Sequence, residues 1–346
     1  MIHVSASIWV DVAIFLAATA AIGIAGTKLA GYADRFADRT GIGEALTGTF
    51  LLGLVTALPG LAASLTAAIQ GHAALALGNA IGGIGFQTTI LAFADIAHRE
   101  ANLEHAAASV ENMIQTVMLI ALLTLVLLGL NGPEMTVGHV HPVTLLLIAA
   151  AIVAFTLVRQ VRDQPMWRPR RTDETVYDLP EEDARDKRSF GLLVFAIVAT
   201  AVLTLASGVF LAEAAGNLVE KTGLSEAVVG AVFMGVATSL PELVTCLAAV
   251  RRRALTLAVA DIVGGNFFDV LFVAAADLCF VGGSIYHASG IGRRETFVVC
   301  LTLLLNVVFL AGLIYRQKHG PGNIGVESLT MLAIYGLGVL VLVLAL

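Results

Sequence analysis

Acidic and hydroxyl side chains lie in the middle of two strongly apolar stretches, residues 235–243 (GVATSLPEL) and 258–269 (AVADIVGGNFFD). They are Thr238, Ser239, Glu242, Asp261 and Asp269. Carboxylate and hydroxyl oxygens are ligands that suit hard cations such as Ca²⁺, Na⁺ and Mg²⁺. Because no Lys or Arg lies at comparable depth in the flanking apolar stretches, these carboxylates need a proton or a bound cation. The pattern therefore predicts a cation site.

A proline interrupts the apolar stretch in each half of the chain, at Pro59 and at Pro241. Proline lacks the N–H that a helix uses, so each should free carbonyl groups, near Thr56 and near Thr238. Free carbonyls are tolerated at membrane depth only where protein or a cavity satisfies them. A cation can do this; a neighbouring Thr or Ser hydroxyl is the alternative partner.

The composition shows which solvent surrounds these elements. Of 346 residues, 58% are hydrophobic and only 13% are charged. An average soluble domain is roughly 45–50% apolar and about 25% charged. The composition therefore excludes an ordinary soluble enzyme, a nucleic-acid-binding protein and a disordered chain. It indicates an all-α polytopic protein in a lipid bilayer, with lipid as its main surrounding.

A spanning helix needs about 20 mostly apolar residues, and ten segments meet this requirement. They are 8–31, 44–69, 74–97, 108–130, 143–158, 190–215, 225–250, 254–280, 295–315 and 325–346. A charged loop, 159–189, separates the first five helices (1–158) from the last five (190–346).

Basic residues predict the orientation, because cytoplasmic loops carry an excess of Lys and Arg. If the loop 159–189 is cytoplasmic, only Lys221, Arg293 and Arg294 fall on the opposite side. Both termini then lie outside. The expected location is a bacterial inner membrane.

The two halves resemble each other when the sequence is shifted by 182 residues. The shift places Thr56-Ala57-Leu58-Pro59 on Thr238-Ser239-Leu240-Pro241, and Gly82-Gly83 on Gly264-Gly265. It also aligns Asp95 with Asp277, which lie late in their helices as gate or interfacial residues. A five-helix unit is odd, so the second copy must enter the membrane from the other side. Inverted repeats of this kind are typical of secondary transporters, with the site near the midplane.

These motifs resemble those of the cation/calcium exchanger superfamily, whose two repeats carry G-T-S-L-P-E followed by G-N-x-x-G-S-N-x-F-[ND]. Residues 237–242 read ATSLPE and residues 260–269 read ADIVGGNFFD. The first repeat is more divergent, with VTALPG at 55–60 and GNAIGGIGFQ at 78–87. The resemblance covers both repeats and implies ten helices in two inverted five-helix repeats.

The resemblance also implies a ligand set around a transported cation. Its members are Glu242, Asp261, Asn79, Thr238, Ser239, Thr56 and Asp269, with the carbonyls near Thr56 and Thr238. The family has Glu in both repeats, whereas this chain has Gly60 in the first, and it has Gly83 and Gly265 where the family has Ser. These departures weaken additional sodium sites more than the central site.

The expected function is a secondary active antiporter that exchanges Ca²⁺ for Na⁺ or H⁺. The alternatives are a monovalent sodium or potassium/proton antiporter of the same fold, and a transport-inactive relative. An intramembrane aspartyl hydrolase fits poorly, because Asp261 and Asp269 are eight residues apart on one helix, about 12 Å. We therefore expect no enzyme and no bound cofactor beyond the transported Ca²⁺ or Na⁺. Neither nucleic acid nor a protein partner is inferred.

Overall fold

The computed structural model describes residues 7–40, 53–98, 100–170, 172 and 189–346, and this part of the chain is helical apart from turns and connections. The first half contains α1 (Ile8–Thr40), α3 (Leu58–Ile69), α4 (Ala73–Ala97), α5 (Leu103–Ala106), α6 (Val110–Asn131) and α7 (Pro142–Asp163). The second contains α8 (Phe190–Thr222), α9 (Glu226–Val228), η2 (Val229–Met234), α10 (Gly235–Thr238), α11 (Leu240–Arg251), α12 (Leu255–Cys279), η3 (Ile285–His287), α13 (Arg293–Tyr315), η4 (Pro321–Asn323) and α14 (Val326–Leu344).

Within the described residues, eight helices are long and apolar enough to cross a membrane. The segments 226–238 and 240–251 are together long and apolar enough for a ninth candidate span, which is bent by 44° at its break. The expected span 44–69 is described only from residue 53 onward, and its first part, with Glu44, lies outside the described residues. The charged connection is shorter than expected at its start, because α7 continues to Asp163.

The 182-residue shift also relates the helix bounds of the two halves. Helix α4 (Ala73–Ala97) becomes α12 (Leu255–Cys279), and α1 becomes α8. The break in the second half, at Ser239, has its counterpart at the turn at Ala57, which precedes α3. Equal sequence patterns thus fold into the same order of helices in both halves.

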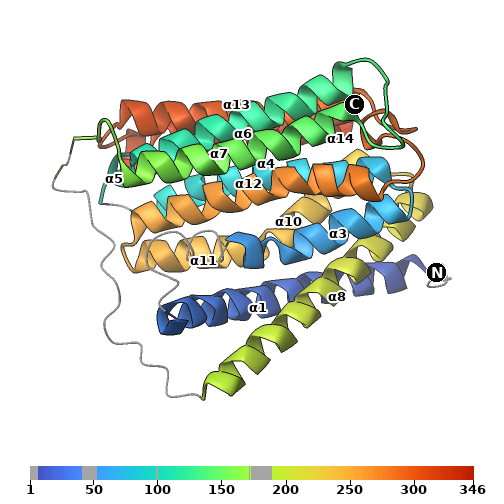
Figure 1. Cartoon of the computed structure of the whole chain (residues 1–346), viewed down its shortest axis with the longest axis horizontal. Helices are drawn as coiled ribbons and strands as arrows, with labels where there is room; N and C mark the ends of the chain where they lie inside the picture. Colours follow the sequence, from blue (N-terminus) through green and yellow to red (C-terminus); the bar gives the residue numbers. More distant parts are fainter. Residues whose placement is uncertain (1–6, 41–52, 99, 171, 173–188) are drawn as a thin grey trace.

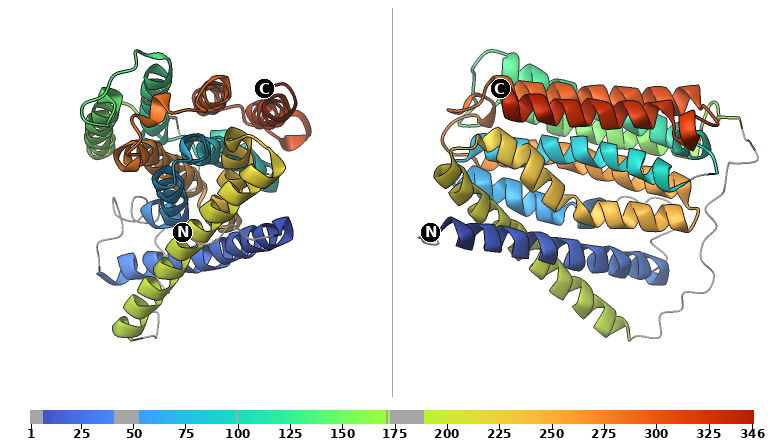
Figure 2. Two further views of the ribbon diagram at one scale, coloured as in Figure 1. Left: turned by 90° about the vertical axis from the view of Figure 1, so that its right-hand side faces the viewer. Right: turned by 180° about the vertical axis from the view of Figure 1, so that it is seen from behind.

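Helices α4 and α12 form the centre of the bundle (Figures 1 and 2). Within an apolar stretch of 18 residues in each of these two helices, 78% of the residues are buried inside the protein. The corresponding share in α1 and α8 is 22%. Helices α1 and α8 pack against each other along one side, and α6, α7, α13 and α14 cover the other. The polar residues of α4 and α12 therefore face protein instead of lipid.

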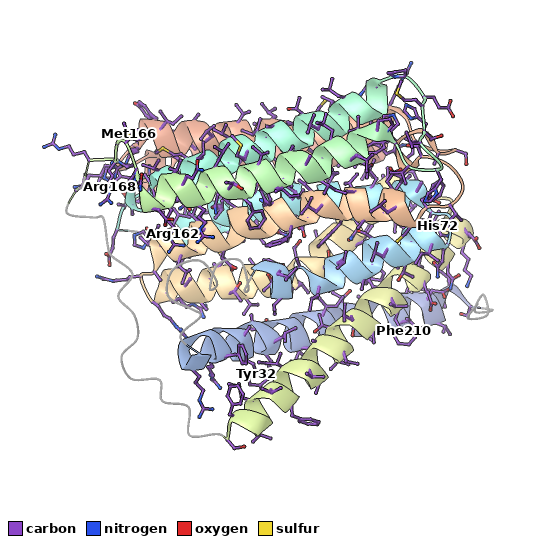
Figure 3. The ribbon with its side chains drawn as sticks, viewed as in Figure 1. Tyr32, His72, Arg162, Met166, Arg168 and Phe210 are labelled. Carbon is purple, nitrogen blue, oxygen red and sulfur yellow. The ribbon has the colours of Figure 1, made fainter. Side chains whose placement is uncertain are left out.

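The two ends of the bundle differ in which chain segments and charged residues lie there. Both chain termini lie at one end, and helix α7 finishes at the other (Figure 1). Arg162 and Arg168 mark the end where α7 finishes, and His72 marks the end of the termini (Figure 3). The start of α1 and the end of α14 therefore lie at the same end of the bundle.

Small residues let the two halves approach closely at the centre. A Cβ atom added at Gly82 would lie 2.3 Å from the Cα atom of Ala231 in η2, and one at Gly235 would lie 2.8 Å from the backbone N of Gly83. Small residues permit this kind of backbone contact between membrane helices. The paired glycines that the repeat aligns are Gly82-Gly83 in α4 and Gly264-Gly265 in α12. Helices α4 and α12 run unbroken through them, so they are contact residues.

Candidate cation site

The site is built on the break between α10 and α11. Helix α10 ends at Thr238, and α11 begins at Leu240 with Pro241 in its first turn. Proline is favoured there because its missing N–H would have no helical partner. The break places Glu242 in the first turn of α11, where its side chain is only 1% exposed.

Glu242 is the most isolated carboxylate of the site. Both of its Oε atoms are buried, and no donor among the described residues reaches them in good hydrogen-bond geometry. The Thr56 side chain is near enough to interact with Glu242, although its hydroxyl donates to the Gly53 carbonyl at 3.2 Å. The carboxylates of Asp269 and Asp261 are also within electrostatic range. A buried carboxylate that has neither hydrogen-bond donors nor a positive neighbour is costly, so Glu242 needs a bound cation or a proton.

Asp269 is held by a residue of the other half of the chain. The Nε2 atom of Gln87, on α4, donates to Oδ2 of Asp269 at 2.6 Å and to Oγ of Ser239 at 3.2 Å. Gln87 was not among the predicted ligands. The 182-residue shift places it on Asp269, so the repeat itself contained the signal. A Cβ atom at Gly83 would lie 3.8 Å from Oδ2 of Asp269, so this glycine leaves room beside the carboxylate.

Asn79 joins three helices. Its Nδ2 atom donates to the carbonyl of Gly60 (3.1 Å) and to Oγ of Ser64 (2.9 Å), both on α3. Its Oδ1 atom accepts a hydrogen bond from the Thr238 hydroxyl (3.2 Å) of α10. The structure thus brings the predicted residues Asn79 and Thr238 together.

Asp261, the repeat counterpart of Asn79, has a similar relation to its own half. Its Oδ2 atom accepts a hydrogen bond from the Thr245 hydroxyl of α11 at 2.8 Å. Asp261 is 2% exposed and lies within electrostatic range of Glu242. Each of the two residues therefore holds the helix that follows the break in its own half, and Asp261 adds negative charge to the site.

Gly60 stands where Glu242 has its counterpart, and an aromatic ring occupies the adjoining space. A Cβ atom at Gly60 would lie 3.2 Å from Cε2 of Phe272 and 3.9 Å from Cβ of Thr238. Phe272 is itself buried, at 4% exposure. Among the described residues, the negative charge of the site consequently comes from the second half of the chain, with amides at Asn79 and Gln87 on the first-half side.

The oxygen atoms of the site are of mixed kinds. Within the described part of the chain, no three His, Cys, Asp or Glu side chains converge in the geometry of a metal cage. Carboxylate, amide and hydroxyl oxygens instead surround the broken helix. Such oxygens bind hard cations, and an incomplete cage suits an ion that must also leave.

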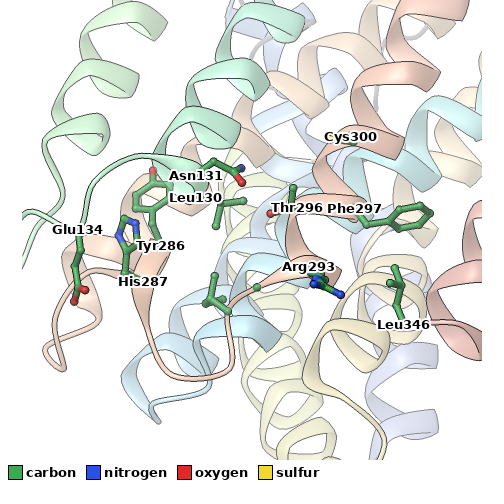
Figure 4. A pocket seen from close by; sticks show the side chains of 12 residues that line it. Leu130, Asn131, Glu134, Tyr286, His287, Arg293, Thr296, Phe297, Cys300 and Leu346 are labelled. Atoms are coloured by element: carbon green, nitrogen blue, oxygen red, sulfur yellow. The ribbon is translucent and has the colours of Figure 1, made fainter.

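A pocket of about 670 Å³ lies elsewhere, at the end of the bundle where α6 finishes and α13 starts (Figure 4). Glu134, His287 and Arg293 are among the residues that line it. None of the predicted ligands belongs to its lining. The candidate cation site at the broken helix is therefore separate from this pocket.

Together, the broken helix, the buried carboxylates and the membrane-spanning bundle define a membrane transporter for cations. The sequence matches the family described as sodium/calcium exchanger protein over residues 10–158 and 191–344. The chain belongs to this family, which consists of transporters and not of enzymes, and the match confirms the resemblance found in the motifs.

Individual relatives agree with this assignment. The proposed antiporter CaxA of Alkalimonas amylolytica is 25% identical over 285 residues, which are 80% of this chain and 85% of CaxA. The crystal structure of the H⁺/Ca²⁺ exchanger CAX has a TM-score of 0.63 at 14% identity, covering 96% of this chain and 86% of that one. The sodium-calcium exchanger NCX_Mj has a TM-score of 0.62 at 14% identity, covering 96% and 99%. At this identity the two structures establish the fold.

Proposed function

We propose that the protein is a secondary active antiporter that exchanges Ca²⁺ for Na⁺ or H⁺ at the broken helix. The observation that carries this proposal is Glu242, which is 1% exposed, has no basic partner among the described residues and lies within range of Asp261 and Asp269. A divalent cation would neutralise two of these charges. Two monovalent cations or two protons would do the same, so the competing ions exclude one another from the same oxygens.

Alternating access follows from the construction of the site. Its ligands come from α4, α10, α11 and α12, and these helices touch through glycine at the crossing of the two halves. Backbones that meet without interlocking side chains can shift relative to one another. The bundle would open toward one side of the membrane and then toward the other while the ion stays near the midplane.

The choice of counter-ion depends on the first half of the chain. Gly60, Gln87 and Gly83 supply neither charge nor hydroxyl there. Fewer oxygens make several simultaneous sodium sites less favourable, which favours protons or a small number of Na⁺ ions. The same scarcity supports the second candidate, a monovalent cation/proton antiporter.

For the membrane orientation we propose that both termini lie outside and that the loop 159–189 is cytoplasmic. The support is the position of Arg162 and Arg168 at the bundle end opposite the termini. A bacterial inner membrane is the proposed location.

The test is flux into proteoliposomes that contain the purified protein. Labelled Ca²⁺ should enter vesicles that are loaded with Na⁺ or H⁺, because the exit of that ion down its gradient drives the entry of Ca²⁺. Glu242→Gln should abolish this flux while the protein still folds. The control is Glu134→Gln, an exposed acid outside the predicted ligand set. Unchanged Ca²⁺ flux in Glu242→Gln would refute the site. Flux of Na⁺ or K⁺ without Ca²⁺ would favour the second candidate, and no flux of any cation would indicate a transport-inactive relative.

A further inference from the structure

Three carboxylates converge at the bundle end where α7 finishes, far along α4 from the cation site. They belong to Asp95 near the end of α4, Glu104 in α5 and Glu327 in the first turn of α14. A Cβ atom added at Gly325 would lie 3.2 Å from Oε2 of Glu104, 3.2 Å from Oε2 of Glu327 and 3.3 Å from Oδ2 of Asp95. The three side chains are 0%, 1% and 9% exposed for Asp95, Glu104 and Glu327. We call this group the acidic clasp.

The hydrogen-bond donors of the clasp are too few for its oxygens. Asp95 accepts the backbone N–H groups of Leu103 (2.6 Å) and Gly325 (2.7 Å). The Ser328 hydroxyl donates to Oε1 of Glu104 at 3.1 Å. The Oε2 atoms of Glu104 and Glu327 are buried and have no donor among the described residues. Both oxygens are directed at the same point beside Gly325, so each faces further negative charge.

Positive charge near the clasp is engaged elsewhere. The guanidinium of Arg316, which follows α13, donates to the backbone carbonyls of His105 and Arg170. His105 in α5 itself has its Nδ1 atom 2.7 Å from the carbonyl oxygen of Arg316. Arg253, before α12, pairs with Glu100. No ion pair between a described basic side chain and Asp95, Glu104 or Glu327 occurs in the part of the chain that the structure describes.

The opposite end of the bundle has a corresponding arrangement without this problem. There Asp277 accepts the N–H groups of Ile285 (2.8 Å) and His141 (2.9 Å), as Asp95 does at the clasp. The position equivalent to Glu104 is Tyr286, and its hydroxyl forms a 3.4 Å hydrogen bond with Thr144. The two ends thus share the aspartate that accepts backbone N–H groups, but Glu104 adds a carboxylate where the other end has the neutral Tyr286. Because the additional carboxylates occur at one end, we expect that end to respond to protons in a way that the other end does not.

We propose that the acidic clasp is a proton-binding site, in which Glu104 carries a proton and donates it to Oε2 of Glu327. One proton satisfies both oxygens that lack a donor and removes one of three adjacent negative charges. The described residues contain no three-carboxylate metal geometry, which favours a proton over a metal ion. Burial, together with the charges of Asp95 and Glu327, raises the pKa of Glu104 to about 8. The proton is therefore bound at neutral pH and leaves in mildly alkaline solution.

Loss of the proton should loosen the contact of α14 with α4 and α5. In the unfolded chain a Glu titrates near its ordinary pKa, so the folded state binds the extra proton between that value and about 8. Linkage then requires that stability falls as the pH rises through this interval and is constant above it. The acidic clasp would make the packing of α14 at one end of the transporter depend on pH, at a place separate from the site of the transported ion.

The experiment compares the wild type with Glu104→Gln and Glu327→Gln, and uses Glu134→Gln as a control. Thermal unfolding of the purified protein is measured from pH 6 to pH 9, and infrared spectroscopy follows the carbonyl band of protonated carboxylic acids over the same range. The wild type and the control should lose several degrees of melting temperature toward pH 9. Glu104→Gln should lose less, because a glutamine amide supplies the missing donor at every pH. Its difference spectrum against the wild type should show one protonated carboxyl that disappears near pH 8.

Three results would overturn the proposal. The first is a Glu104→Gln protein with the full pH dependence of the wild type. The second is a difference spectrum without a protonated carboxyl band at pH 6. The third is a melting temperature that Ca²⁺ raises in the wild type but not in Glu104→Gln, again without that band, since the clasp would then be a metal site. If Glu104→Gln fails to fold, the same comparisons are made with Glu327→Gln, which replaces the second carboxylate of the clasp by a neutral amide.

Discussion

Restoring an acid at Gly60 tests why the first half of the chain lacks one. The substitution Gly60→Glu places five heavy atoms where the nearest neighbour is the ring of Phe272. The first of them, Cβ, would lie 3.2 Å from Cε2 of Phe272, which is closer than the ~3.5–4.0 Å of a relaxed carbon contact. For alanine the ring needs to move by only a few tenths of an ångström. For glutamate four more atoms need space that the ring now fills.

The expected cost follows from overpacking. Gly60→Glu should destabilise the protein by about 1–3 kcal/mol, the usual range for extra atoms in a packed interior, and should not improve Ca²⁺ binding. The double variant Gly60→Glu/Phe272→Ala makes room for the carboxylate beside Thr238. It should bind Ca²⁺ at least ~10-fold more tightly than the wild type, equivalent to about 1.4 kcal/mol. Phe272→Ala alone should cost about 3–5 kcal/mol, because it empties the same space.

Thermal unfolding in detergent and calorimetric titration with Ca²⁺, both on the same preparations, provide the assay. Gly60→Ala is the matched control and should melt close to the wild type. A Gly60→Glu protein as stable as the wild type would show that Phe272 does not fill this space. A double variant that is stable but does not gain affinity would show that position 60 does not face the ion.

Three further predictions concern other parts of the molecule. Asp261→Asn should weaken Ca²⁺ binding more than Na⁺ binding in calorimetric titrations, because Coulomb attraction scales with ion charge; equal losses would indicate a structural or proton-carrying group. Gly82→Ala should lower the melting temperature and the flux, since its Cβ atom would lie 2.3 Å from backbone of η2, whereas Gly336→Ala, with open space around it, should do neither. The hydrogen bond to Glu226 (2.7 Å) raises the pKa of His72, so its stabilisation is complete below the ordinary pKa and is lost as the pH rises through the raised one. The melting temperatures of the wild type and Glu226→Gln should therefore converge in alkaline solution.

The helices and their repetition could be predicted from the sequence because both depend on local or one-dimensional properties. Length and hydropathy of a segment decide whether it can cross a bilayer, and the observed bounds of α4 and α12 lie within one residue of the predicted 74–97 and 254–280. The proline after Thr56-Ala57-Leu58 and after Thr238-Ser239-Leu240 likewise marks each break, since proline interrupts a helix wherever it stands in the interior. The family followed from motifs at these same positions.

Side-chain partners between distant segments could not be predicted in this way. Glu226 lies at the start of α9, yet its carboxylate binds His72 and the backbone N–H of Leu75, more than 150 residues earlier in the sequence. Asp95 had no preferred role until the fold placed it beside Glu104 and Glu327. Contacts of this kind depend on the angle and rotation of packed helices, which hydrophobic patterns leave undetermined.

The site shows the same division. Its charged residues are evident from the sequence, because an acid within an apolar span is costly wherever it packs and therefore indicates function. That Gln87 holds Asp269, and that Phe272 occupies the space beside Gly60, depends on how α4, α3 and α12 are packed together. Composition and motifs are enough to identify which chemical groups enter the membrane. Which of these groups meet depends on how the helices of the two halves pack, because that packing sets burial and distance.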